Sequence, residues 1–167
     1  APPAGARRSL GEELQQAAAI CLRGRSAVVS MFREARMGQA IHAEQCEPLV
    51  EEISASVARN PGALVSLARL KSVDEYTFMH SVAVCALMIA LGRQLGLDEA
   101  ALRAAGMAGL LHDMGKALVP SEILNKPGKL SDAEFAQIKK HPELGHALLV
   151  EGKAVAPGVL DVCLHHH

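Results

Sequence analysis

A histidine and an aspartate stand side by side at positions 112 and 113, with Gly115 and Lys116 close behind them. Neighbouring residues of a helix point about a quarter-turn apart, so these side chains converge only where a helix ends, and Gly115 permits that bend. A carboxylate can bind two cations with its two oxygens, and imidazole binds Fe, Mn, Ni, Co or Zn. The pair therefore predicts a two-metal hydrolytic centre bridged by Asp113, where Lys116 stabilises charge on a phosphate oxygen. An exposed His-Asp pair at a helix end is the alternative.

Further histidines occur where they could complete such a centre. His80 interrupts an apolar helical pattern, in which its alternative role is that of a hydrogen-bonded core residue. His141 precedes Pro142, so it could instead cap the C-terminal end of the preceding helix. The three histidines at 165–167 end the chain, as a purification tag would. The apolar helical pattern of residues 159–164 continues directly into these histidines without a linker, which favours histidines that belong to the native protein over a tag.

Helices must position these residues. Apolar residues recur at helical spacing along most of the chain, and no run alternates as a strand would. Helix starts are marked by Asp98 as an N-cap, by Ser131 with Glu134 as a capping box, and by Pro142 and Pro157 in first turns. The predicted helices cover residues 11–37, 41–59, 63–70, 74–95, 98–112, 131–140, 142–150 and 157–167. In the first of them, Gly24 and Arg25 interrupt the apolar stripe.

The composition agrees with an all-α fold. Half of the 167 residues are apolar, but only one is a tyrosine and none is a tryptophan. Ala, Leu and Val must therefore fill the interior, which favours closely packed helices over a sheet. Residues 98–112 are rich in Ala and Gly, so a neighbouring backbone can approach that helix closely. We expect a linker over 1–10 and an N-terminal helical segment over 11–59, which packs on the core or forms a homodimer seam.

Charge and cysteine usage indicate the setting. The net charge of -1 gives no general attraction to a nucleic-acid polymer or an anionic membrane. The four cysteines form no CxxC pair, which favours buried free thiols in a reducing cytoplasm. The longest apolar run, residues 82–91, is too short to span a bilayer, and no signal peptide pattern opens the chain. We therefore expect a cytoplasmic protein that has no membrane segment.

Several motifs occur in a fixed order along the second half of the chain. They are Asp74-x-Tyr76-Thr77-x-x-His80-Ser81, His112-Asp113-Met114-Gly115-Lys116, Pro120, Ile123-Leu124-x-Lys126-Pro127-Gly128, and His141-Pro142 with Gly145. In order and spacing they resemble the HD-GYP family, a branch of the HD-domain metal phosphohydrolases. The resemblance makes residues 60–167 a partial HD-GYP domain, and residues 11–59 look like the helical segment that precedes it in some bacterial members.

The resemblance implies an all-α HD-domain bundle that hydrolyses the bacterial second messenger cyclic di-GMP to pGpG or GMP. It assigns catalysis to Asp113 and Lys116, and substrate binding to Tyr76 and to Lys116, which would contact the scissile phosphate. In some relatives, a glutamate occupies the position of Tyr76 and supports a third metal ion. A phenol is a poor ligand, so two divalent transition-metal ions (Fe, Mn or Ni) are expected. The implied metal ligands are His80, His112, Asp113, His141, His166 and His167.

The end of the chain departs from the family pattern. Relatives continue from the two final histidines with a glutamate and a Gly-Tyr-Pro loop, and a further helix supplies another aspartate ligand. We therefore expect the chain as given to bind metal partially or not at all, and to hydrolyse cyclic di-GMP negligibly.

Two other functions stay open. A regulatory module could keep the fold without turnover and bind nucleotide or a partner such as a cyclic di-GMP synthase domain, but the complete histidine set with Lys116 favours an enzyme. The chain could also be a general HD hydrolase that acts on another nucleotide. The stretch Lys126-Pro127-Gly128, which matches the HD-GYP motif, argues against this alternative. The lysines at 126, 129, 139 and 140 could attract a diphosphate ring, although such a run is more often a solvated helix face.

Overall fold

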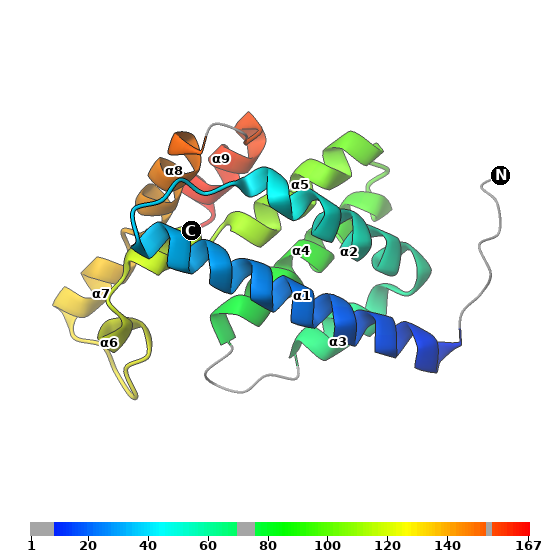
Figure 1. Ribbon diagram of the computed structural model, residues 1–167, viewed down its shortest axis with the longest axis horizontal. Helices are drawn as coiled ribbons and strands as arrows, with labels where there is room; N and C mark the ends of the chain where they lie inside the picture. The colour runs from blue at the N-terminus through cyan, green and yellow to red at the C-terminus, as the bar shows by residue number, and fades with distance from the viewer. Residues whose placement is uncertain (1–8, 70–75, 153–154) are drawn as a thin grey trace.

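The computed structural model describes residues 9–69, 76–152 and 155–167, and for residues 67–69 and Tyr76 it describes the backbone alone. Within these ranges the chain is helical and contains no strand, which confirms the predicted all-α fold (Figure 1). The elements are α1 (Leu10–Arg36), η1 (Ala43–Cys46), α2 (Glu47–Arg59), α3 (Pro61–Arg69), α4 (Tyr76–Gln94), α5 (Glu99–Leu111), η3 (Met114–Leu118), α6 (Ser121–Leu124), α7 (Asp132–Ile138), α8 (His141–Glu151) and α9 (Pro157–His165).

Helix α4 is the central helix of the bundle and packs against α1, α2, α3 and α5. Val82, Cys85 and Ile89 are fully buried on it. By length and composition, its segment Thr77–Gln94 could cross a membrane, with a mean hydropathy of 1.2. This segment is longer than the uninterrupted apolar run of residues 82–91, on which the sequence-based expectation of no membrane segment was based. Four other helices of the same chain pack against α4, and 44% of this segment is buried.

A glycine lets α5 cross α4 closely, as the sequence predicts. A Cβ on Gly109 of α5 would lie 2.8 Å from the Cα of Cys85 in α4, too close for a side chain to fit. This crossing sets the middle of α4 against the C-terminal end of α5. It therefore brings His80 of α4 next to His112, the residue that caps α5.

Helix α1 runs along the bundle as one continuous helix (Figure 1), and Gly24, which interrupts the apolar stripe in the sequence, is buried within it. A Cβ at this position would lie 2.6 Å from Cγ2 of Val82, so glycine lets α1 approach α4. Phe32 of α1 also packs edge-on against Phe78 of α4, with ring centroids 5.4 Å apart. The N-terminal helix therefore packs on the main core. The division of the chain into 1–10, 11–59 and 60–167 stays a prediction.

The capping residues act as predicted. Asp98 accepts a hydrogen bond at the start of α5, and Ser131 with Glu134 forms a capping box at the start of α7. Pro142 and Pro157 lie in the first turns of α8 and α9. All four cysteines of the sequence fall in the described ranges and are buried and free, as expected.

Some predicted helix ends differ from the structure. The helix predicted from Ile41 begins later, as the short turn η1 that becomes α2, because Pro48 lacks the N–H that an earlier α-helical turn would need. The last helix ends at His165 rather than at the end of the chain. The two short helices η3 and α6 were not predicted. Leu70 and Asp74, a predicted helix end and a predicted helix start, lie outside the described residues.

Candidate metal centre

Asp113 lies at the centre of a cluster of histidines, and its side chain is almost fully buried. Its Oδ2 atom is 3.2 Å from Nε2 of His112 and 3.8 Å from Nε2 of His80. Its Oδ1 atom is 3.2 Å from Nε2 of His141 and 3.6 Å from Nε2 of His166. The two oxygens of one carboxylate therefore face two different pairs of imidazoles, which is the arrangement of a bridging ligand.

The six predicted metal ligands come together from four elements. Among the described residues, two groups have ligand atoms that all lie within 4.8 Å of one another: His80, His112 and Asp113 form the first, and His141, His166 and His167 form the second. These residues come from α4, from the end of α5, from the start of α8 and from the end of α9. The structure thus contains two adjacent groups of side chains that could bind a metal ion, and Asp113 lies between them.

Backbone carbonyls fix three of the rings. In each of His112, His141 and His166, Nδ1 donates to the carbonyl three residues earlier, of Gly109, Ile138 and Cys163 respectively, at 2.8, 2.6 and 2.9 Å. Because a carbonyl can only accept, Nδ1 carries the proton and Nε2 presents its lone pair to Asp113. Such second-shell bonds orient metal-ligating histidines.

These tautomers make the cluster suited to cations. Nε2 of His141 and Nε2 of His166 lie 3.0 Å apart, yet in the neutral rings neither nitrogen has a proton to donate. Lone pairs and carboxylate oxygens therefore converge on the same space. Divalent transition-metal ions would accept these lone pairs and carboxylate oxygens as ligands, since imidazole and carboxylate bind Fe, Mn, Ni and Zn.

The HD-domain family profile matches residues 51–167, which are most of the chain and include all six of these side chains. This chain belongs to the HD-domain family.

Relatives of the HD domain include curated cyclic dinucleotide phosphodiesterases. A cyclic di-GMP phosphodiesterase of Pseudomonas aeruginosa is 60% identical over 167 residues, which are 100% of this chain and 40% of that protein. The cyclic di-GMP phosphodiesterase response regulator RpfG of Xanthomonas campestris pv. campestris is 37% identical over 110 residues, which are 61% of this chain and 28% of that protein. A 3'3'-cGAMP-specific phosphodiesterase of Vibrio cholerae is 43% identical over 68 residues, which are 41% of this chain and 16% of that protein.

The chain spans less than half the length of each of these relatives. No solved structure matches it significantly. The family match and these relatives confirm the HD-GYP membership that the ordered motifs indicate.

The protonation states in the HD domain suit metal binding. Burial would raise the pKa of Asp113, but the contacts of its carboxylate with His112, His141 and the ammonium of Lys116 hold that pKa far below its ordinary value. Burial, together with the nearby His112 and His167, lowers the pKa of His166. The lowered pKa values favour the anionic form of Asp113 and the neutral form of His166, and these are the forms that can bind a metal ion.

A second close contact joins the two halves of the site. A Cβ on Gly115 of η3 would overlap the carbonyl oxygen of His141 and lie 2.5 Å from the backbone nitrogen of Gly145. This contact holds the start of α8 against the His112-Asp113 turn. The His112-Asp113 pair closes α5, and Gly115 follows it as predicted, but Gly115 does not have a positive φ, unlike the turn residue Gly38 (φ 68°). Glycine is needed here for space.

Lys116 and a cleft lie beside the cluster. The Nζ atom of Lys116 is 2.7 Å from Oδ2 of Asp113, and its side chain is 21% exposed, so the ammonium is shared between the carboxylate and solvent. The cleft has a volume of about 520 Å³, within the usual size of ligand pockets. It is lined by Lys116, His141 and His167 on the metal side, and by Phe135, Ile138 and Lys139 of α7 and its C-cap.

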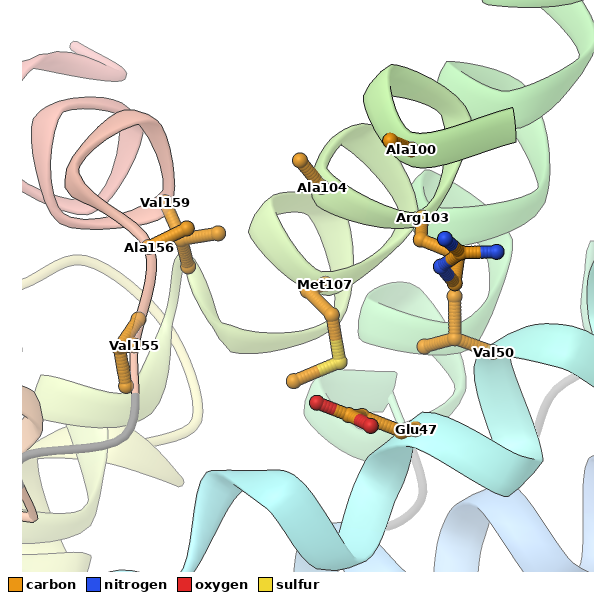
Figure 2. A pocket seen from close by; sticks show the side chains of 9 residues that line it. All are labelled: Glu47, Val50, Ala100, Arg103, Ala104, Met107, Val155, Ala156 and Val159. Atoms are coloured by element: carbon orange, nitrogen blue, oxygen red, sulfur yellow. The ribbon is translucent and has the colours of Figure 1, made fainter. Parts of the chain in front are cut away.

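Another hollow lies elsewhere in the HD domain, between the start of α2, α5 and the start of α9, and has a volume of about 200 Å³ (Figure 2). Its lining is Glu47, Val50, Ala100, Arg103, Ala104, Met107, Val155, Ala156 and Val159. Figure 2 shows the carboxylate of Glu47 beside the end of Met107, with Arg103 over Val50. It contains no histidine and only one carboxylate, so it lacks the converging ligands of the Asp113 cluster.

Other predictions have mixed outcomes. The side chain of Tyr76, predicted to bind substrate, lies outside the described residues. His165 pairs with Asp161 on the surface at 3.1 Å and belongs to neither group of candidate ligands, unlike the two histidines that follow it. Of the four lysines that could attract a diphosphate ring (126, 129, 139 and 140), Lys139 lines the cleft and Lys126 pairs with Glu134 at 2.7 Å.

The apolar wall of the cleft was not predicted from the sequence. Phe135 is 49% exposed, whereas Phe32 is 4% exposed in the core. One signal was available in the sequence: Phe135 is one of only three phenylalanines and lies between the lysine-rich segments that flank the expected site.

Proposed function

We propose that this HD domain hydrolyses a phosphodiester bond of cyclic di-GMP, yielding pGpG or GMP. The observation that carries the proposal is the division of the Asp113 oxygens between two histidine pairs, beside a cleft that also holds Lys116. Two-metal centres of this kind clamp both the attacking and the leaving oxygen of a phosphoryl transfer. The relatives named as cyclic di-GMP phosphodiesterases support this choice of substrate.

Two divalent transition-metal ions, of Fe, Mn or Ni, are the cofactors we propose. Asp113 would bridge them, with His80 and His112 as ligands of one ion and His141, His166 and His167 as ligands of the other. When bound, the two ions supply Lewis acidity for in-line displacement at phosphorus.

The side chains themselves supply orientation and charge. The Nδ1 bonds of His112, His141 and His166 keep each Nε2 aimed at the centre. Lys116 faces the cleft with a fixed positive charge, from which it can donate to an oxygen of the scissile phosphate as negative charge develops there. Its contact with Asp113 holds the ammonium close to the reacting phosphate.

The test is a hydrolysis assay on the whole protein that carries this domain. Cyclic di-GMP and 3'3'-cGAMP are each incubated with the protein loaded with Mn²⁺ or Fe²⁺, and products are identified by mass spectrometry. We expect cyclic di-GMP to be cleaved to pGpG or GMP, and Lys116→Ala to cleave it slowly. Binding of cyclic di-GMP without any cleavage would instead support a regulatory module.

The setting of the domain is part of the proposal. Its buried free thiols fit the cytoplasm, where cyclic di-GMP synthase domains are candidate partners. Leu10, Leu14, Leu22 and Val29 expose apolar side chains on α1, which supports a homodimer through the N-terminal helices. Sedimentation of the wild type beside a Leu22→Lys variant tests that arrangement: the variant should be monomeric, and equal mass for both would oppose it.

A further inference from the structure

An exposed aromatic ring lies in the cleft beside the metal ligands. Phe135 of α7 is 49% exposed, and it shares the cleft with His141, His167 and Lys116. Single exposed apolar side chains are common on protein surfaces. Phe135 differs because its surroundings are a concave site that also holds metal-binding and cationic groups.

A second cation accompanies this ring. Nζ of Lys139 lies 4.5 Å from the centroid of Phe135, four residues earlier in the chain. Lys139 therefore stands on the α7 wall of the cleft, whereas Lys116 stands on the Asp113 wall. The cleft thus has an aromatic surface and one positive charge on each side.

The position of α7 is held by contacts outside the cleft. Glu134 accepts hydrogen bonds from Nζ of Lys126 at 2.7 and 2.8 Å, and from the backbone nitrogen of Ser131 at 2.7 Å. These bonds tie the loop before α7 to the first turn of the helix. Phe135 follows Glu134 directly, so the ring is presented from a braced helix.

A cyclic dinucleotide needs more than a metal centre to be bound. It carries two bases and two phosphates, and the metal centre engages only the phosphate that is cleaved. Aromatic side chains bind bases by stacking, because every base has a π-face. A lysine binds phosphate as a point charge.

We propose that Phe135 is the stacking surface for one guanine base of the substrate, and that Lys139 binds the phosphate that is not cleaved. This rests on the proposed function, since it places a cyclic dinucleotide in the same cleft. Phe135 and Lys139 are then residues that determine substrate affinity, while Lys116 and Asp113 act at the scissile phosphate.

The absence of tryptophan from the chain gives a direct test. Phe135→Trp introduces a single tryptophan in the cleft, and stacking of a guanine base quenches its fluorescence. We expect saturable quenching by cyclic di-GMP and by GMP, and none by ribose 5-phosphate, which has no base. Leu87→Trp is the matched control, because Leu87 is 50% exposed on α4 and does not line the cleft.

The Lys139 contact is tested in the same assay. Lys139→Ala in the Phe135→Trp chain should weaken cyclic di-GMP about tenfold or more and GMP much less, because only the cyclic dinucleotide has a second phosphate. Equal quenching at positions 135 and 87, or no quenching at either, would overturn the proposal.

Kinetics separate this proposal from the proposed function. In the whole protein, Phe135→Ala should raise KM for cyclic di-GMP about tenfold with little change in kcat, and Phe135→Tyr should restore it. Unchanged KM in Phe135→Ala, with a wild type that cleaves cyclic di-GMP, overturns the stacking role alone. Quenching at position 135 in a protein that cleaves nothing supports the stacking role and overturns the phosphodiesterase.

Discussion

Gly115 packs directly against the backbone of His141, so closely that a Cβ on residue 115 would overlap the His141 carbonyl oxygen. Gly115 follows the bridging residue Asp113 by two positions, and His141 begins α8. The contact therefore sets the distance between the two histidine groups of the site. The geometry of the metal centre depends on a glycine that has no chemistry of its own.

Gly115→Ala should loosen this junction. We expect a loss of about 1–3 kcal/mol in the free energy of unfolding, because the methyl group forces η3 and α8 apart, and lower metal content because His141 moves from Asp113. Denaturant titration and elemental analysis measure the two effects. Gly158→Ala is the control: no atom lies within 4 Å of its Cβ position, so it should change stability by less than about 0.5 kcal/mol. Equal stability of the two variants would contradict the packing role of Gly115.

The sequence predicts the fold and the ligands for physical reasons. Helical spacing and capping residues such as Asp98 are local signals, and they give the all-α fold and most helix starts. The side chains that cluster around Asp113 could be identified because polar residues such as His80 interrupt apolar patterns at family spacing, and their role as ligands stays a prediction. No local pattern reveals which helices cross, so the close contacts that Gly24 and Gly115 permit were not predicted. The cleft wall was missed because Phe135 acquires its role only from the placement of α7.

The ion pair between Lys126 and Glu134 should be visible in a titration. The hydrogen bond from Lys126, with those from Ser131, lowers the pKa of Glu134 from 4.5 to about 2. A lowered folded-state pKa means that this stabilising effect is complete above pH 4.5 and is lost as the pH falls toward 2. Lys126→Ala should therefore raise the pKa of Glu134, measured by NMR of its carboxyl carbon, while Lys129→Ala leaves it unchanged. An unchanged pKa in Lys126→Ala would oppose the pairing.

The packing of α1 on the core predicts a large effect at Phe32. This ring is 4% exposed and contacts Phe78 edge-on. Phe32→Ala should cost about 3–5 kcal/mol of unfolding free energy, measured by denaturant titration. Leu91→Ala on the exposed side of α4 should cost less than about 0.5 kcal/mol, since Leu91 is 61% exposed. A neutral Phe32→Ala would mean that α1 is not part of the domain core in solution.

Lys116 should affect chemistry but not metal binding. Because its ammonium is placed to stabilise charge on phosphate, Lys116→Ala should lower kcat for cyclic di-GMP by about 10²–10³-fold. The metal content of the variant, from elemental analysis, should match that of the wild type, since all six proposed ligands remain. Loss of metal in parallel with kcat would instead make Lys116 a structural support of Asp113.

The central claim is that Asp113 bridges two metal ions, one on each side. The most direct measurement is the number of Mn²⁺ ions bound by the whole protein and by three variants, from titration and elemental analysis. Asp113→Ala should lose both ions, with affinity reduced more than about tenfold. His80→Ala and His141→Ala should each lose one ion and keep the other, because they lie on opposite oxygens of the carboxylate. Wild-type metal content in Asp113→Ala, or loss of the same single ion in both histidine variants, would contradict the bridge.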